Sequence, residues 1–453
     1  MTAWTAASVS AALGLPGGDP ALRFSSITTD SRALVRDGLF VALSGDRFDG
    51  HAFLAAARDA GATGAVVREG TTPVPGLHLF PVRDTLRAYG DLAAAFRDQI
   101  RGPVVAITGT NGKTSTKEMV AAILRLRYAT HATPANLNNL VGVPHTVLSA
   151  PRGTEALVVE AGASVPGEIA RYREILRPDI AVVTNVAPGH LEGFGSLEGV
   201  LREKTALLEG VPLAVVGTEP ASLADRARAV ADTVVVAGMD GADVQAGPLT
   251  IDAQGCPHWT VEGVEVRLSI PGRHQVANAM LAWAVGASFG FEPVAMAGAL
   301  AGVQLPGGRG EIRRQGEFLI LHDAYNANPH SFRGTISVAR DLRAATGRRL
   351  VFIAGTMREL GPEAARWHRE VGSALRALRP DVLAVVGDFG PALAGLGPPA
   401  EGVVELTADD PLALAPLLRP HLHGTDLVVL KASRGVALER ILPLLVSPAA
   451  PPT

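Results

Sequence analysis

Cysteine is almost absent from this chain of 453 residues, because Cys256 is the only one. A single cysteine excludes any disulfide within the chain, which is compatible with a reducing cytoplasm, and we predict that location. An excess of one charge sign is absent as well, since the formal net charge is −3. Long-range electrostatics therefore gives no reason to expect nucleic acid or a membrane surface as a partner.

The chain also lacks an apolar run that is long enough to cross a membrane. The uncharged stretch QVANAMLAWAVGASFGF carries Gln275 and Asn278 and is shorter than a membrane span, which needs about 20 apolar residues. We therefore predict a buried core helix here and no membrane insertion. The first residues, MTAWTAASVSAALGLPGG, contain no basic segment, so no secretory signal peptide is expected.

What the sequence does contain is a repeated alternation of β-rich apolar runs and helix-forming segments. Runs such as VVAITG, ALVVEAG and IAVVTNV stand between helical segments, which indicates an α/β protein with a parallel sheet covered on both faces. Breaks at Arg101-Gly102-Pro103 and at QLPGGRGEIRR divide the chain into three blocks. The alternation then restarts with RRLVFIAGTM, DVLAVVGDFG and TDLVVLKASRG, and the tail VSPAAPPT is predicted to be disordered.

The stretch VVAITGTNGKTSTKEMV, residues 104–120, contains a candidate phosphate-binding loop between a strand and a helix. The predicted ATP-binding residues of the loop are Gly109, Thr110, Asn111, Gly112, Lys113, Thr114 and Ser115. Backbone N–H groups and the helix dipole favour a phosphate at such a turn. Lys113 can reach the β- and γ-phosphates, and the Thr114 hydroxyl can ligate Mg²⁺. The common P-loop has a glycine where Ile107 stands, so a tighter loop is expected.

This loop resembles the ATP loop of the Mur ligase superfamily, whose members make amide bonds on peptidoglycan precursors. Further motifs match in the family's order: TDSRALVRDGLFVALSGDRFDGHAF, NLNNLVGVPHTVL, VAPGHLEGFGS and DAYNANPHSF. They are most similar to the branch that adds D-alanyl-D-alanine to a UDP-N-acetylmuramoyl-tripeptide. The resemblance implies three domains: a UDP-substrate domain (1–101), a central P-loop ATPase domain with a parallel sheet (102–305), and a C-terminal Rossmann-like α/β domain for the dipeptide (306–453).

The activity that the resemblance implies is an ATP-dependent ligation through an acyl phosphate, which an amine then attacks. Two dense negative charges must approach each other, so cations are the main catalytic requirement. Lys204 matches a lysine that many Mur ligases carry as a carbamate. The implied catalytic residues are Lys113, Glu160, His190 and Lys204. The implied Mg²⁺ ligands are Thr114, Glu160, His190 and carbamylated Lys204.

Further contacts with the small-molecule substrates follow from the same resemblance. The residues implied to hold adenine, phosphates and ribose are Asn278, Arg309 and Asp323. Those implied to contact the UDP substrate are Ser31, Arg32 and Asn136. Those on the dipeptide side are Asn326, Lys431, Ser433 and Arg434. His368, in a helical segment, is assigned no role.

Four positions depart from the family's pattern, without removing a phosphate- or metal-binding group. Ala135 and Ala432 stand where the family has glycine, Gln275 replaces an asparagine, and Thr356 replaces an acid.

Other functions remain open at this point. A ligase that adds the third residue of the same peptide is one alternative. When such a ligase uses diaminopimelate, it carries the string DNPR in its third domain, and this chain lacks that string. A folylpolyglutamate synthetase would leave residues 1–100 without a purpose. A non-catalytic ATP-binding scaffold would not need Glu160, His190 and Lys204. A monomer is expected, and the third residue of the acceptor peptide stays undetermined.

Overall fold

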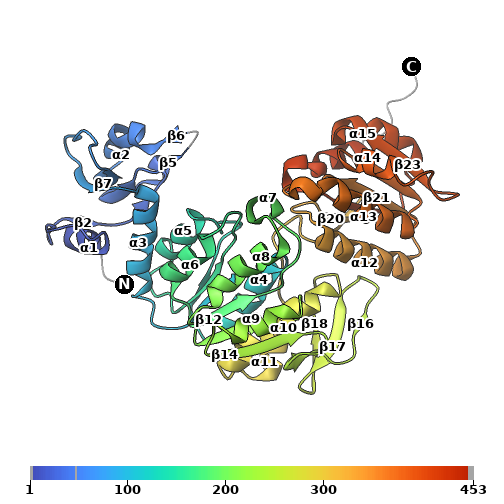
Figure 1. Cartoon of the computed structure of the whole chain (residues 1–453), viewed down its shortest axis with the longest axis horizontal. Coiled ribbons are helices and arrows are strands. Elements are labelled where there is room, and N and C mark those ends of the chain that lie inside the picture. Colours follow the sequence, from blue (N-terminus) through green and yellow to red (C-terminus); the bar gives the residue numbers. More distant parts are fainter. Residues whose placement is uncertain (1–3, 46–47, 447–453) are drawn as a thin grey trace. The chain divides into compact units, whose positions relative to one another are not determined.

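The computed structural model describes residues 4–45 and 48–446 (Figure 1). The chain divides into two compact units. The first comprises Met1–Ile107, Arg127–Ala163 and Gly167–Ala181, and the second comprises Thr108–Leu126, Ser164–Pro166 and Val182–Thr453. This division does not test the boundaries predicted after residues 101 and 305, which stay predictions. Most of the tail that was predicted to be disordered, residues 447–453, lies outside the described residues.

The first unit begins with a four-stranded parallel sheet in the order β3-β4-β7-β8. Its strands are β3 (Ile27–Thr28), β4 (Gly38–Val41), β7 (Ala62–Arg68) and β8 (His78–Val82), and helix α2 (Leu54–Asp59) packs on it. Two short antiparallel pairs accompany the sheet. They are β1 (Trp4–Thr5) with β2 (Arg23–Phe24), and β5 (Ser44–Gly45) with β6 (Phe48–Asp49).

The same unit contains three further parallel strands in the order β10-β11-β9. These are β10 (Thr130–Ala132), β11 (Ala156–Glu160) and β9 (Val104–Thr108), and helices α3 (Thr85–Arg97), α5 (Gly142–Leu148) and α6 (Glu168–Leu176) belong with them. Every residue of β9 and β11 is buried, as expected for strands covered on both faces. Glu160 is paired with Ile107, which places a carboxylate at the carboxyl end of this ladder, where α/β sheets bind ligands.

The second unit contains the parallel strands β13 (Leu213–Val216), β14 (Thr233–Gly238) and β15 (Val244–Gln245). Helix α10 (His274–Ser288) packs against α4 (Lys113–Leu124) and α11 (Pro293–Ala301). Met280, Leu281 and Trp283 of α10 are buried, so the prediction of a core helix is confirmed. Within residues 4–45 and 48–446, no helix has the length and apolar character that a membrane span requires. An antiparallel ladder of β16 (Thr250–Ile251), β17 (Pro257–Val261) and β18 (Val264–Arg267) follows β15.

The second unit ends in a six-stranded sheet in the order β19-β20-β24-β21-β22-β23. Its strands are β19 (Glu311–Gln315), β20 (Phe318–Asp323), β21 (Leu350–Gly355), β22 (Val382–Val386), β23 (Val404–Ala408) and β24 (Leu427–Lys431), and only β19 runs antiparallel. Helices α12 (Pro329–Thr346), α13 (Ala364–Ala377), α14 (Phe389–Ala394) and α15 (Pro411–Leu418) join these strands.

Successive residues of the six-stranded sheet enter two different cores. Phe352 and Val429 pack with side chains of α12 and α13, whereas Val351 and Val428 pack with side chains of α15. Because side chains alternate along a strand, burial on both faces requires an unbroken apolar run. The runs that the sequence shows between helices are explained in this way.

Candidate active site

Two glycines give the predicted phosphate loop its tight turn between β9 and α4. Gly109 has φ = 140° and Gly112 has φ = 80°. A Cβ at Gly109 would lie 2.0 Å from Thr184 Oγ1, and a Cβ at Gly112 would lie 2.1 Å from Asn278 Oδ1. Both positions therefore require glycine for their backbone conformation and for the space beside them.

Residues that follow β12 (Ile180–Val183) hold the loop in place. Thr184 Oγ1 donates a hydrogen bond of 2.5 Å to the Asn111 carbonyl, and the Asn111 N–H donates to Asn185 Oδ1 at 3.1 Å. The Thr110 N–H donates to the Asn185 carbonyl at 2.9 Å. Thr184 and Asn185 were not among the predicted site residues. Their position as polar residues directly after an apolar strand was the signal that could have identified them.

Lys113 is folded back over the phosphate loop. Its Nζ donates to the carbonyl oxygens of Gly109 at 2.9 Å and Thr110 at 3.1 Å. Thr114 and Ser115 are buried at the N-terminus of α4. The ammonium thus lies at the turn where the backbone and the helix dipole favour an anion.

Glu160 is almost completely buried, with 1% of its surface exposed. Its Oε1 accepts a hydrogen bond of 2.7 Å from Asn138 Nδ2, and its N–H donates to Thr133 Oγ1 at 2.9 Å. Asn139 binds the start of α5 instead, because its Oδ1 accepts from the N–H of Gly142, the first residue of that helix, at 2.8 Å. The two adjacent asparagines therefore have different partners: Asn138 binds the Glu160 carboxylate, whereas Asn139 binds the backbone of α5. Neither asparagine was among the predicted site residues.

Asn136, the third asparagine of this segment, is exposed, and it follows a residue in a strained conformation. Ala135 has φ = 49°, in the left-handed region that favours glycine. The family's glycine at this position is explained by this backbone, and the alanine here adopts it at some cost.

His190 and Lys204 lie near α7 (Leu191–Phe194) and α8 (Leu197–Thr205). His190 Nδ1 is 2.5 Å from Glu359 Oε2, and this contact holds the pKa of Glu359 below its usual range. Lys204 is 1% exposed, and its Nζ lies 5.4 Å from the centre of the Phe194 ring. Lys204 is thus buried within the fold, unlike a solvated surface lysine.

The side chains predicted to bind Mg²⁺ can be judged by the donor atoms that they offer. No group of three or more His, Cys, Asp and Glu side chains within residues 4–45 and 48–446 is arranged to hold a metal. Mg²⁺ prefers hard oxygen donors and keeps several of its waters. The Glu160 carboxylate and the Thr114 hydroxyl are each a donor of this kind, so the chemistry of either group suits the ion.

Asn278, predicted to contact adenine, lies beside the phosphate loop. Its Nδ2 donates to Gln275 Oε1 at 2.9 Å, and its Oδ1 accepts from Thr116 Oγ1 at 3.4 Å. Gln275, which replaces the family's asparagine, therefore takes part in fixing this amide.

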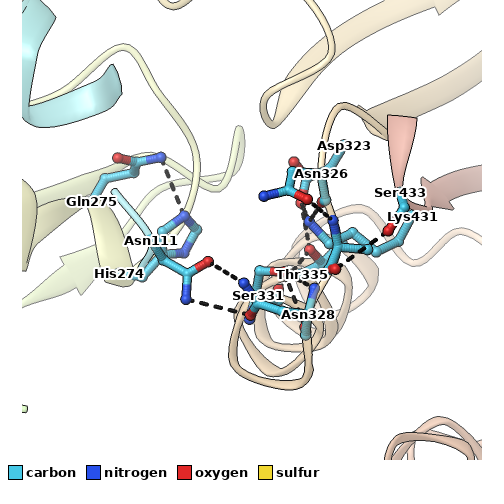
Figure 2. Close-up of polar contacts among 11 residues, drawn as sticks. Asn111, His274, Gln275, Asp323, Asn326, Asn328, Ser331, Thr335, Lys431 and Ser433 are labelled. Carbon is cyan, nitrogen blue, oxygen red and sulfur yellow. Dashed lines mark hydrogen bonds and ion pairs between the residues drawn. The ribbon is translucent and has the colours of Figure 1, made fainter. Parts of the chain in front are cut away.

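Asp323, which is partly exposed, and the buried Lys431 form an ion pair at the carboxyl ends of β20 and β24 (Figure 2). Lys431 Nζ donates to Asp323 Oδ2 and to the Asn326 carbonyl, both at 2.8 Å, and only 2% of Lys431 is exposed. Asp323 Oδ2 also accepts from Thr335 Oγ1 at 2.5 Å. The Lys431 ammonium is thus already neutralised within its own domain.

The other residues predicted for the phosphates and the dipeptide, Arg309, Ser433 and Arg434, differ in exposure and in their partners. The Arg309 guanidinium stacks over the Tyr325 ring at 3.8 Å from its centre. Ser433 is buried, and its Oγ accepts from the Arg358 N–H at 2.9 Å. The Arg434 side chain is 66% exposed and pairs with Glu439 at 3.0 Å.

A reciprocal amide pair joins the phosphate loop to helix α12 (Figure 2). Asn328 Nδ2 donates to Asn111 Oδ1 at 2.8 Å, and Asn111 Nδ2 donates to Asn328 Oδ1 at 3.3 Å. Asn328 also caps α12, because its Oδ1 accepts from the Ser331 N–H at 2.9 Å. Asn328 was not among the predicted site residues.

In the first unit, Ser31 and Arg32 belong to a short 3₁₀ turn, Ser31–Ala33. Asp30 caps the turn by accepting from the Arg32 N–H at 2.9 Å, and the two side chains form an ion pair of 2.9 Å. The hydrogen bond from the Arg32 side chain lowers the pKa of Asp30 to about 2. The Arg32 side chain is 88% exposed, so it is accessible to a ligand.

Comparison with known proteins places these features in one family. The Mur ligase middle domain matches residues 107–286, and the Mur ligase, glutamate ligase domain matches residues 308–434. The UDP-N-acetylmuramoyl-tripeptide–D-alanyl-D-alanine ligase of Escherichia coli is 36% identical, over 94% of each chain. A crystal structure of MurF from Acinetobacter baumannii superposes with a TM-score of 0.88 at 28% identity, covering 98% of this chain and 99% of that one. MurF from Thermotoga maritima in complex with ADP gives 0.82 at 28% identity, covering 93% and 96%.

Proposed function

The chain belongs to the Mur ligase family, and we propose that it joins D-alanyl-D-alanine to a UDP-N-acetylmuramoyl-tripeptide in peptidoglycan precursor synthesis. The observation that carries the ATP-dependent part is the phosphate loop, whose two glycines leave no room for a side chain. The substrate assignment is supported by a relative with that named activity that matches 94% of the chain.

The ligation proceeds in two steps in this proposal. The terminal carboxylate of the tripeptide attacks the γ-phosphorus of ATP, so ADP leaves and an acyl phosphate forms. The neutral amine of the dipeptide then attacks the acyl carbon and the C–O bond to phosphate breaks. The nitrogen loses one proton, which the leaving phosphate can accept, so that an amide and inorganic phosphate result. The first step brings negative charges together, so preorganised positive charge contributes most to its rate.

The nucleotide-side roles are distributed over the second unit. We assign Lys113 and the loop N–H groups to the triphosphate, where Lys113 would exchange its carbonyl partners for phosphate oxygens. Arg309, released from Tyr325, would add charge at the phosphates. Asn278 and Asp323 are assigned to adenine and ribose.

Mg²⁺, when bound, supplies charge that neutralises the phosphates and polarises the transferred group. We propose Thr114, Glu160 and His190 as its protein contacts. Lys204 is buried, and we propose that it carries a carbamate, which forms when a neutral lysine amine reacts with CO₂. Asn138 would keep the Glu160 carboxylate in one orientation.

Ser31, Arg32 and Asn136 are proposed to contact the UDP substrate, and all three lie in the first unit. On the dipeptide side, we propose Asn326 and the exposed Arg434 as direct contacts. Lys431 and Ser433 would act mainly by fixing the residues around them, because both are buried in hydrogen bonds. A monomeric enzyme of the cytoplasm, with small molecules as its partners, completes the proposal.

The test is a ligation assay with ATP, Mg²⁺, D-alanyl-D-alanine and UDP-N-acetylmuramoyl-tripeptides that carry diaminopimelate, lysine or ornithine as the third residue. We expect a product of the combined mass and ADP formation that requires both other substrates. Lys113→Ala should abolish most turnover while keeping the unfolding transition. Absence of product with all three acceptors, or full turnover of Lys113→Ala at saturating ATP, would contradict the proposal.

A further inference from the structure

A cleft of about 840 Å³ lies at the carboxyl ends of β21, β22 and β23. One wall is the loop of residues 356–362, which follows β21. Asp388, Asp410 and Glu192 of α7 also line the cleft. Carboxyl ends of parallel strands are the usual ligand edge of an α/β sheet, so the conformation of this loop determines the shape of a binding site.

His368, on α13, holds this loop through its imidazole ring. Its Nε2 accepts a hydrogen bond of 2.9 Å from the Met357 N–H, and its Nδ1 lies 2.8 Å from the Ala364 carbonyl. Nε2 must therefore be unprotonated and Nδ1 must carry the hydrogen. The residue is completely buried, and its ring meets the Phe389 ring edge to face at 4.8 Å. Burial lowers the pKa of His368, in agreement with this neutral form.

The hydrogen bond from Met357 to His368 fixes the start of the loop, and the next two residues, Arg358 and Glu359, make contacts that depend on the loop's conformation. The Arg358 N–H donates to Ser433 Oγ at 2.9 Å, and the Arg358 guanidinium donates to the Gly435 carbonyl at 3.0 Å. Glu359 adopts φ = 64°, a left-handed conformation that persists only when its surroundings enforce it. In this conformation the Glu359 carboxylate reaches His190 at 2.5 Å.

We propose that His368 is a positioning residue of the ligation: it fixes the loop of residues 356–362 so that the cleft receives the incoming amine substrate and Glu359 meets His190. The inference rests on the proposed function, since the amine must be held at the acyl phosphate. A small displacement of such a wall misplaces the nucleophile, and a misplacement of about 1 Å can cost about 100-fold in rate. His368 itself touches neither the substrates nor the reacting atoms.

The experiment compares His368→Phe, His368→Gln and Leu375→Ala in the full chain. Phenylalanine fills similar space without an acceptor for the Met357 N–H, whereas glutamine keeps an acceptor. Leu375 is buried on the same helix two turns away, so its truncation reports a general loss of stability. Unfolding midpoints and KM for D-alanyl-D-alanine, ATP and the UDP substrate are measured for each variant, well below its midpoint.

We expect His368→Phe to lower kcat/KM for the dipeptide about 10- to 100-fold, with KM for ATP within about threefold of the parent value. His368→Gln should recover part of the loss, and Leu375→Ala should not reproduce it. Equal kinetics of His368→Phe and Leu375→Ala, or a loss spread equally over all three substrates, would overturn the inference. If the parent protein forms no product, the proposed function fails first, so the two failures are distinguishable.

Discussion

Replacing Gly112 by alanine should weaken nucleotide binding by an amount that can be derived from the loop geometry. The backbone at this position has φ = 80°, and a left-handed conformation costs an alanine roughly 1–2 kcal/mol. The new Cβ would lie 2.1 Å from Asn278 Oδ1, so the Asn278 amide must move. Its hydrogen bonds with Gln275 and Thr116 are worth about 1 kcal/mol each.

The total is about 3–4 kcal/mol, which corresponds to a 100- to 1,000-fold increase in Kd if the loop must regain its shape to bind. Titration calorimetry with ADP or a non-hydrolysable ATP analogue in Mg²⁺ measures Kd, and urea unfolding measures stability.

Gly210→Ala is the matched control for this experiment. Gly210 has φ = 65°, and a Cβ there would meet nothing within 4 Å. Only the conformational cost applies, so this variant should lose stability without a change in nucleotide Kd. An unchanged Kd for Gly112→Ala, or an equal increase for Gly210→Ala, would refute the assignment of Gly112 to the nucleotide site.

Three further predictions concern other parts of the chain. Ala135→Gly should raise the free energy of unfolding by about 1 kcal/mol in urea, because it relieves a left-handed alanine; lower stability would contradict this. Lys204→Ala should be nearly inactive, with activity partly restored by small carboxylic acids, whereas an active variant would exclude a carbamate. Arg32→Ala should return the pKa of Asp30 from about 2 toward 3.8 in an NMR titration. The parent's stabilisation by Asp30, present above pH 3.8 and lost as the pH falls toward 2, should then shrink.

The local elements of the site were predictable because neighbours in sequence define them. An apolar run, two glycines and Lys113 specify a strand, a turn and a helix start, and the structure places them so. The burial of Lys431 was not predictable, since its partner Asp323 is 108 residues away. Asn328 and Asn138 were missed for the same reason. An asparagine side chain is uncharged, so charge patterning in the sequence does not single it out. Its role depends on the residue with which it forms a hydrogen bond in the fold.

His368 is different, because a signal was present in its own helix. Val371, Gly372 and Leu375 follow it at the spacing of one helical face, and all four are buried. The apolar face of α13 could therefore have identified His368 as an interior residue. That His368 accepts a hydrogen bond from the Met357 N–H could be seen only in the structure. The spacing of residues along a helix does not predict the conformation of a loop beside it.

The amide pair of Asn111 and Asn328 has a consequence for how fast ATP can associate. The Asn111 N–H, carbonyl and side chain are all satisfied by neighbouring residues, so the loop is assembled before a nucleotide arrives. Association then need not include the entropic cost of ordering the loop. Both partners are uncharged, so ionic strength leaves this resting geometry unchanged. The amide pair should therefore add nothing to the salt dependence of the association rate, which arises from the charged groups of the site and the triphosphate.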